Sequence, residues 1–192
     1  PHLCFKDAPG YRADGNCRAC MVEVEGERVL AASCIREAVP GMVVRSAGSA
    51  RAQEARRAVL ELLLADQPAQ DSSPDRSSHL WETADQLAID VGDVRQRLPA
   101  RSERNEPTVH HVEPRSDSLA HARGHDATHS AMNVNLDACI TCGLCERACR
   151  EVQGNDVIGL AHRGAESKVV FDFDDPMGDS TCVACGECVQ PC

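Results

Sequence analysis

The sequence predicts an α+β protein built from small modules, and three observations support this fold class. Residues 21–25 alternate apolar and charged side chains, and a second extended run follows Gly26, which predicts a β-hairpin with one buried face. Apolar side chains recur at helical spacing over residues 50–65, directly after Ser49, which predicts an N-capped amphipathic helix. Residues 133–192 contain two copies of a compact cysteine motif, with short strand candidates between them.

The composition indicates a fold that needs support beyond an ordinary apolar core. The chain has 192 residues, enough for one or two small domains, yet only 3% of them are aromatic. Small domains with thin cores usually depend on disulfides, metals or a partner, and the twelve cysteines are the evident source of such support. The net charge of −10 argues against nucleic acid as a partner, because an acidic surface repels phosphates.

Three blocks of different character follow one another along the chain. We expect residues 1–68 to form one domain, residues 69–132 a helix followed by a linker, and residues 133–192 a second domain. Within the middle block, an amphipathic pattern predicts a weak helix over 78–89, and the composition from Pro99 onward is that of a linker.

The helix over 50–65 and the strands of the third block carry more detailed expectations. The helix should end before Pro68. The strands are expected at 157–160 and 168–173. The predicted buried face of the helix consists of Ala52, Ala55, Val59, Leu62 and Leu63.

The first block holds four cysteines with two long spacers and one short one. They are Cys4, Cys17, Cys20 and Cys34, spaced C-x12-C-x2-C-x13-C. We expect a [2Fe-2S] cluster here, with Cys17 and Cys20 on one iron and the outer two cysteines on the other. Plant-type [2Fe-2S] ferredoxins use a much shorter first spacer, so a zinc site or a set of reduced structural thiols stays open as an alternative.

The two cysteine motifs of the third block are the strongest functional signal. Both read C-x2-C-x2-C-x3-C, the pattern of bacterial two-cluster ferredoxins, in which the fourth cysteine of each motif ligates the other cluster. Gly143 and Gly186 follow the second cysteine of each copy and should let backbone N–H groups approach sulfur. The predicted [4Fe-4S] ligands are Cys139, Cys142, Cys145 and Cys192 for one cluster, and Cys182, Cys185, Cys188 and Cys149 for the other.

Zinc and disulfides explain these motifs less well. Zinc sites usually take two cysteine pairs separated by a long spacer, which leaves the third cysteine of each copy without a role. Disulfides between cysteines three positions apart are strained and usually redox-active.

Cysteines kept as thiols for metal binding indicate a reducing compartment, so we expect a cytoplasmic protein. The sequence has no signal peptide, and no apolar run approaches the ~20 residues of a membrane span. The chain begins at Pro1 rather than Met, which fits a fragment whose true N-terminus lies upstream.

Other polar candidates carry weaker signals. His121, His125 and His129 are spaced by four and could share a helix face, but they lie in linker composition without a carboxylate or cysteine to complete a metal site. Three arginines near the predicted clusters could stabilise reduced states, although solvated surface charge is the simpler interpretation for most of them. They are Arg147, Arg150 and Arg163. No catalytic triad or phosphate-binding loop is present, so we assign no catalytic residue.

Several segments carry a resemblance to a known family: 1–4, 15–24, 32–34, 61–66, 134–159, 171–172 and 174–188. They resemble the N-terminal iron–sulfur region shared by the large subunit of complex I, iron-only hydrogenases and molybdenum- or tungsten-dependent formate dehydrogenases. The later segments look like the catalytic subunit of NAD-dependent formate dehydrogenases. The resemblance implies a partial β-grasp [2Fe-2S] ferredoxin-like module, a helical linker and a bacterial two-[4Fe-4S] ferredoxin-like module.

The sequence departs from that family in three ways. The family's β-grasp domain begins with a hairpin and helix before the first cysteine, and these are absent here. Many relatives also have a cluster with one His and three Cys ligands, but no cysteine lies between 35 and 138, and the expected His position falls near Gln67 and Pro68. Finally, the family continues into a large molybdopterin domain, whereas this sequence stops at Cys192.

The resemblance implies an electron conduit that belongs to an oxidoreductase without containing its catalytic site. Electrons from a Mo/W-bis-molybdopterin formate site in a separate catalytic domain would pass through the clusters to a flavin- and NAD-binding diaphorase-type partner. An alternative is the small diaphorase subunit of an NAD-reducing nickel–iron hydrogenase. A cluster-based redox or oxygen sensor is a third reading, but no DNA-binding or signalling element accompanies the clusters.

Overall fold

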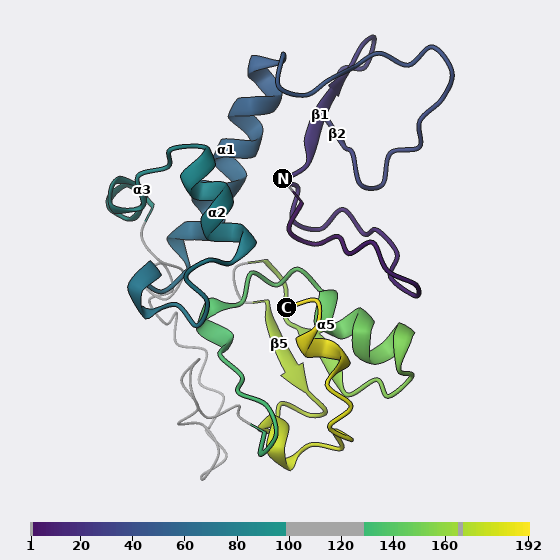
Figure 1. The fold of residues 1–192 in the computed structure, drawn as a ribbon, viewed down its shortest axis with the longest axis vertical. Helices are drawn as coiled ribbons and strands as arrows, with labels where there is room; N and C mark the ends of the chain where they lie inside the picture. The colour runs from purple at the N-terminus through teal and green to yellow at the C-terminus, as the bar shows by residue number, and fades with distance from the viewer. Residues whose placement is uncertain (1, 99–128, 165–166) are drawn as a thin grey trace.

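The computed structural model describes residues 2–98, 129–164 and 167–192. Their elements form an upper part, which contains a small sheet and three helices, and a lower part, which contains the two cysteine motifs (Figure 1). The N-terminal segment, purple in Figure 1, runs between the strands of the upper part and helix α5 of the lower part. The mixed α and β content agrees with the predicted class.

The small sheet confirms the predicted hairpin and extends it. Strand β1 (Met21–Val24) pairs antiparallel with β2 (Ala31–Ala32), and Met21 faces Ala32 in the register. Gly26 lies in the turn with φ of 84°, a left-handed value that favours glycine. A strand that we did not expect, β3 (Val44–Arg45), pairs with the other side of β1, which gives the order β2-β1-β3.

Helix α1 (Ala50–Ala65) has the predicted bounds, and its predicted buried face is right in part. The Ser49 hydroxyl accepts a hydrogen bond from Ala52 N at 3.1 Å, as expected of an N-cap. Ala52 is buried as predicted, and Leu63 is half-buried against the core. Leu62, predicted to be buried, is 53% exposed, whereas Leu60 and Leu64 are fully buried. Four leucines lie within the last six residues of this helix, so their spacing alone does not identify which of them face the core.

Helices α2 (His79–Gln86) and α3 (Val91–Arg97) complete the upper core with α1. The predicted helix over 78–89 is shorter than expected, because the chain turns through a left-handed Ala88. We did not expect α3, which is capped by the Asp90 carboxylate through hydrogen bonds from Gly92 N and Asp93 N. The core of this part consists of Leu3, Ala19, Leu60, Leu64, Ala65, Leu80, Trp81, Ala84, Ile89 and Val94.

The lower part confirms both predicted strands and places them in one hairpin. Strand β4 (Ile158–Ala161) pairs antiparallel with β5 (Lys168–Phe171), with Ile158 opposite Phe171. Helix α5 (Leu144–Arg147) continues directly into a π-helical turn, Ala148–Val152. The second core consists of Cys149, Val157, Ile158, Val169, Phe171 and Met177, so one predicted cluster ligand is part of the apolar packing.

Several expectations fall on residues outside the described ranges. The linker from Pro99 onward lies almost entirely there, as do His121 and His125 of the weak histidine candidate. Their companion His129 forms an isolated bridge with Met132 and accepts a hydrogen bond from Ala131 N. In the described part of the chain, no helix combines the length and the apolar character needed to cross a bilayer.

Candidate iron–sulfur sites

All twelve cysteines lie in the described residues, and none of them forms a disulfide. Three gatherings of cysteines can be distinguished, one around Cys4 and two on the walls of cavities, with Cys188 on the wall of both cavities. Within residues 2–98, 129–164 and 167–192, no three His, Cys, Asp or Glu side chains are close enough to hold a single metal ion.

The first group joins the thiols of Cys4, Cys17, Cys20 and Cys34. The Cys17 amide donates to Cys4 Sγ at 3.3 Å, while Cys20 and Cys34 interact directly with each other. Burial first, and then the hydrogen bond with Cys20, raises the pKa of Cys34 to about 11. For Cys20, burial is outweighed by hydrogen bonds from Cys34 and Ser33, so its pKa is lowered.

These contacts differ from the expected pairing of Cys17 with Cys20. The chain reverses at Arg18, whose φ is 58°, and Ala19 is fully buried in the upper core. The structure therefore brings Cys17 beside Cys4 and leaves Cys20 beside Cys34.

The second group lines a cavity of about 710 Å³ between the upper and lower parts, with Cys139, Cys142, Cys145 and Cys192 on its wall. Burial is the main cause that raises the pKa of Cys142 to about 11. Burial likewise raises the pKa of Cys145, and repulsion from neighbouring thiols adds to it. Such thiols ionise only where a strong positive charge compensates, as iron does when it binds them.

The third group shares a small apolar cavity in the lower part, lined by Cys149, Cys182, Cys185 and Cys188. Cys149 belongs to the first motif but lies with the cysteines of the second. Its Sγ accepts a hydrogen bond from Val157 N at 3.3 Å. Cys149, in the π-helical turn after α5, therefore lies beside the three cysteines with which the sequence predicts that it shares a cluster.

The backbone has the same conformation at equivalent positions of the two motifs. Thr141 and Ala184 have left-handed φ values of 51° and 55°, and Gly143 and Gly186 both have φ of 76°. Thr141 N donates to Cys139 Sγ at 3.3 Å, and Ala184 N donates to Cys182 Sγ at 3.4 Å. A β-branched residue such as Thr141 rarely adopts a positive φ, so the loop around the sulfur atoms, and not the residue's own preference, imposes this conformation.

The donor chemistry of all three groups fits iron–sulfur clusters. Each group offers four cysteine thiols outside disulfides, and each contains at least one backbone N–H that points at sulfur. Hydrogen bonds of this kind stabilise thiolate ligands and tune the reduction potential of iron–sulfur clusters.

The long spacer between Cys4 and Cys17 makes contacts that the sequence did not predict. The Asn16 amide donates to the Cys142 carbonyl at 3.2 Å, and the Tyr11 hydroxyl donates to Glu187 Oε1 at 2.9 Å. Burial first, and then the bond with Glu187, raises the pKa of Tyr11 to about 12. Residues 5–16 therefore form a loop, which we call the docking loop, that lies against both cysteine motifs.

The three arginines near the predicted cluster sites differ in burial and in their partners. Arg147 is buried, whereas solvated charge was the simpler expectation for most of these arginines. Its guanidinium donates a hydrogen bond to the Gly143 carbonyl, four residues earlier in the chain. Arg150 is exposed and paired with Glu146 and Asp156, and Arg163 is exposed. A further side chain that we did not single out, Asn155, approaches Cys185 Sγ at 3.9 Å.

Gln67 occupies the position where a histidine ligand was expected from the family. Its side chain is buried on the wall of the larger cavity, and its amide nitrogen has no hydrogen-bond partner among the described residues. Its backbone carbonyl accepts a hydrogen bond from Arg95.

The fold and the thiol groups define a ferredoxin-like iron–sulfur protein, and comparisons with known proteins agree. Residues 1–49 match the family described as "2Fe-2S iron-sulfur cluster binding domain". The full length of the chain aligns at 31% identity with the NADP-reducing hydrogenase subunit HndD of Solidesulfovibrio fructosivorans, and the alignment covers 30% of that protein. A 56-residue stretch, 29% of the chain, is 38% identical to 6% of a Staphylococcus haemolyticus protein named as a formate dehydrogenase.

A solved structure extends this likeness to the fold. A chain of the crystal structure of an NAD+-reducing [NiFe]-hydrogenase in the H2-reduced state superposes with a TM-score of 0.68 at 27% identity. The match covers 96% of this chain and 68% of that one.

The chain spans less than a third of the length of the curated relatives it matches. These relatives also include components of bacterial NADH-quinone oxidoreductases. Residues 1–49 therefore match a 2Fe-2S domain, and the chain as a whole is similar to parts of hydrogenase and NADH-quinone oxidoreductase subunits, which confirms the resemblance found in the sequence.

Proposed function

We propose that this chain carries electrons through three clusters held by its twelve cysteines. The [2Fe-2S] cluster would have one iron on Cys4 and Cys17 and the other on Cys20 and Cys34, following the contacts between these thiols. The two [4Fe-4S] clusters would take the crossed ligand sets, Cys139, Cys142, Cys145 and Cys192 for one and Cys182, Cys185, Cys188 and Cys149 for the other.

The single observation that carries this proposal is the gathering of the thiols into three adjacent groups. Cys188 lies on the walls of both lower cavities, so the two predicted [4Fe-4S] sites adjoin each other. Cys4 is close enough to Cys142 for their charges to interact, so the [2Fe-2S] site adjoins the first of them. Iron–sulfur clusters of this kind accept and release single electrons, and the protein supplies ligands, N–H donors and exclusion of water.

Sequence features and one relative support a proposed position for the conduit in a larger enzyme. We place it between a molybdopterin Mo/W formate site in another domain and a flavin- and NAD-binding diaphorase-type partner. This placement rests on the resemblance of residues 171–188 to formate dehydrogenase sequences, and on the match of a 56-residue stretch to a protein named as a formate dehydrogenase. Reduced thiols that bind metal suit the cytoplasm, where we expect the protein.

A second candidate is the small diaphorase-type subunit of an NAD-reducing hydrogenase. Two observations favour it: the solved hydrogenase chain matches 96% of this chain, and a hydrogenase subunit matches its full length. The formate dehydrogenase match covers less than a third of the chain.

Iron and acid-labile sulfide analysis with EPR tests the proposal. We expect about ten irons per chain, since one [2Fe-2S] and two [4Fe-4S] clusters require that number, and one [2Fe-2S] signal distinct from two [4Fe-4S] signals. Zinc in place of iron, or only about four irons, would overturn it. In the complete enzyme, reduction of the clusters by formate with bound Mo or W supports the first placement, and reduction by H2 supports the second.

A further inference from the structure

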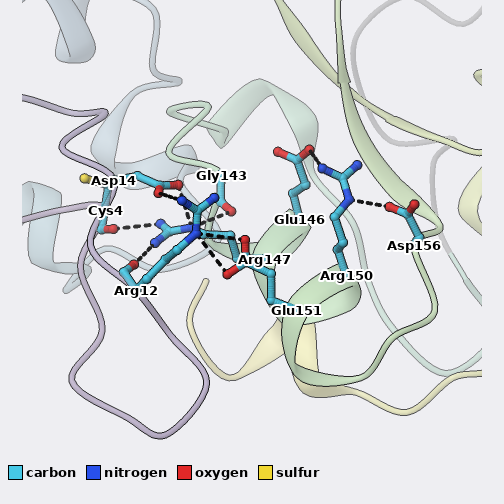
Figure 2. Close-up of polar contacts among 9 residues, drawn as sticks. All are labelled: Cys4, Arg12, Asp14, Gly143, Glu146, Arg147, Arg150, Glu151 and Asp156. Atoms are coloured by element: carbon cyan, nitrogen blue, oxygen red, sulfur yellow. Dashed lines mark hydrogen bonds and ion pairs between the residues drawn. The ribbon is translucent and has the colours of Figure 1, made fainter.

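Arg147 is a buried cation between two of the predicted cluster sites. Its residue exposure is only 3%, and its guanidinium donates hydrogen bonds to three backbone carbonyls, those of Cys4 at 2.8 Å, Gly143 at 3.3 Å, and Arg12. The Asp14 carboxylate pairs with it at 3.1 Å. Figure 2 shows these partners around the guanidinium, while Arg150 on the next turn points away toward Glu146 and Asp156.

Two of the partners of Arg147 belong to two different predicted cluster sites. Cys4 is a predicted [2Fe-2S] ligand, and Gly143 directly follows Cys142, a predicted [4Fe-4S] ligand. A second bridge runs beside the first, because Asn16 precedes Cys17 and donates to the Cys142 carbonyl. The contact is tight, since a Cβ atom on Gly143 would lie 3.2 Å from Asn16 Nδ2.

A purely structural role for the Arg147–Asp14 pair has to be weighed first. Buried ion pairs often contribute little net stability, because desolvation of both charges offsets their attraction. Here the cation lies against backbone groups of two redox sites, in surroundings where charge is poorly screened. Reduction adds one negative charge to a cluster, so a neighbouring cation should favour the reduced form.

We propose that Arg147 is a positioning residue that couples the [2Fe-2S] site to the first [4Fe-4S] site, an inference that rests on the proposed function. Its hydrogen bonds hold the Cys4 and Gly143 segments together, and its charge raises the potentials of both sites. Cys142 and Cys4 would hold the donor [4Fe-4S] and the acceptor [2Fe-2S] cluster. One electron would pass from the first cluster to the second, which would oxidise the first and reduce the second by one electron, with no bond broken and no proton moved.

The second cysteine motif supplies a natural test variant. Gln190 holds the position equivalent to Arg147 in that motif and is exposed, so Arg147→Gln installs the residue of the other copy. Arg150→Gln is the matched control, because it removes an arginine from the same helical segment that faces solvent. Asp14→Asn and the double variant Arg147→Gln/Asp14→Asn separate charge from packing.

The measurements are redox titrations followed by EPR on the cluster-loaded protein, with a one-electron reductant such as dithionite. Arg147→Gln should lower the [2Fe-2S] potential so that reduction becomes about tenfold less favourable, which is about 59 mV for one electron. Asp14→Asn should raise it, the double variant should return near the original value, and Arg150→Gln should leave it unchanged. Arg147→Lys should leave the [2Fe-2S] reduction potential close to that of the unaltered protein, because it retains the positive charge. It should weaken the spin coupling between the two clusters.

Unchanged potentials in Arg147→Gln, with the full iron content retained, would overturn the inference. If Arg147→Gln assembles no clusters, Asp14→Asn and Arg147→Lys test the inference instead. An unchanged [2Fe-2S] potential in Asp14→Asn, together with unchanged spin coupling in Arg147→Lys, would also overturn the inference. Failure of the proposed function is a different result, because it appears as low iron in the unaltered protein.

Discussion

The two cysteine motifs have the same spacing and the same loop conformation but different surroundings. Thr141 and Gly143 of the first motif match Ala184 and Gly186 of the second in their left-handed φ values. Among the equivalent positions that differ, Leu144, Arg147 and Ala148 in the first motif correspond to Glu187, Gln190 and Pro191 in the second. Leu144 and Arg147 are buried, while Gln190 is exposed.

These differences explain why the motifs continue differently. After its glycine the first motif forms α5 and the π-helical turn, with Ala148 N donating to the carbonyls of Leu144 and Cys145. Pro191 has no N–H to make the equivalent bond, and the second motif forms only a 3-10 turn, Glu187–Val189. The spacing of the cysteines therefore sets the loop conformation around the sulfur atoms. The other residues of each motif and the surrounding fold decide that the first motif, and not the second, is buried at Leu144 and Arg147.

The largest expected effect concerns the crossed cysteines. Cys149→Ala and Cys192→Ala should each cost up to about four irons per chain, because each removes one ligand of a [4Fe-4S] cluster. Only Cys192→Ala should abolish spin coupling to the [2Fe-2S] signal, since its cluster is the one beside Cys4. EPR with iron analysis makes the measurement, and loss of coupling in Cys149→Ala instead would show that the ligands do not cross.

The burial difference between the motifs should appear in stability. Leu144 is 4% exposed in the first motif, so Leu144→Ala should destabilise the protein by about 2–5 kcal/mol. Val183 in the second motif is 65% exposed, and Val183→Ala should stay within about 0.5 kcal/mol. The urea concentration at half loss of cluster absorbance checks both, and equal shifts would contradict the difference in packing.

The two equivalent glycines offer the sharpest matched pair. Gly143→Ala and Gly186→Ala should each cost about 1–2 kcal/mol, because both impose a side chain on a left-handed residue. Only the new Cβ at Gly143 meets a neighbour, Asn16 Nδ2 at 3.2 Å. Spin coupling between the [2Fe-2S] and [4Fe-4S] signals should therefore weaken in Gly143→Ala alone. Equal weakening in both variants would mean that the Asn16 contact carries no coupling.

The smallest effect reports how the docking loop meets the second motif. Tyr11 is the only tyrosine, and its pKa should be about 12, above the usual value near 10. A raised pKa means that the neutral phenol is favoured by folding, so this contribution is full below pH 10 and is lost as the pH rises through 12. NMR of labelled tyrosine measures the titration. Glu187→Gln should lower the pKa only partway, because burial remains, and no change would exclude the Glu187 bond as a cause.

Local patterns predicted the elements whose partners lie nearby in the sequence. The hairpin, the helix over 50–65 and the strands β4 and β5 follow from alternation, capping and helical spacing within a few residues. The burial of Leu60 and Leu64 on α1 was missed because packing against α2 and α3 decides it, and β3 was missed because it is short and exposed. The docking loop was missed because polar residues such as Asn16 give no periodic signal.

The sequence by itself predicted a grouping for the eight cysteines of residues 133–192, since their two- and three-residue spacers restrict which sulfurs can face one space. Only the tertiary structure decided that Arg147 lies between two of these groups. Its partner Cys4 is 143 residues away in the chain, and no local pattern distinguishes it from the exposed Arg150 three residues later. Burial of a charge depends on which distant carbonyls and carboxylates the fold brings to it, and spacing along the chain contains no record of them.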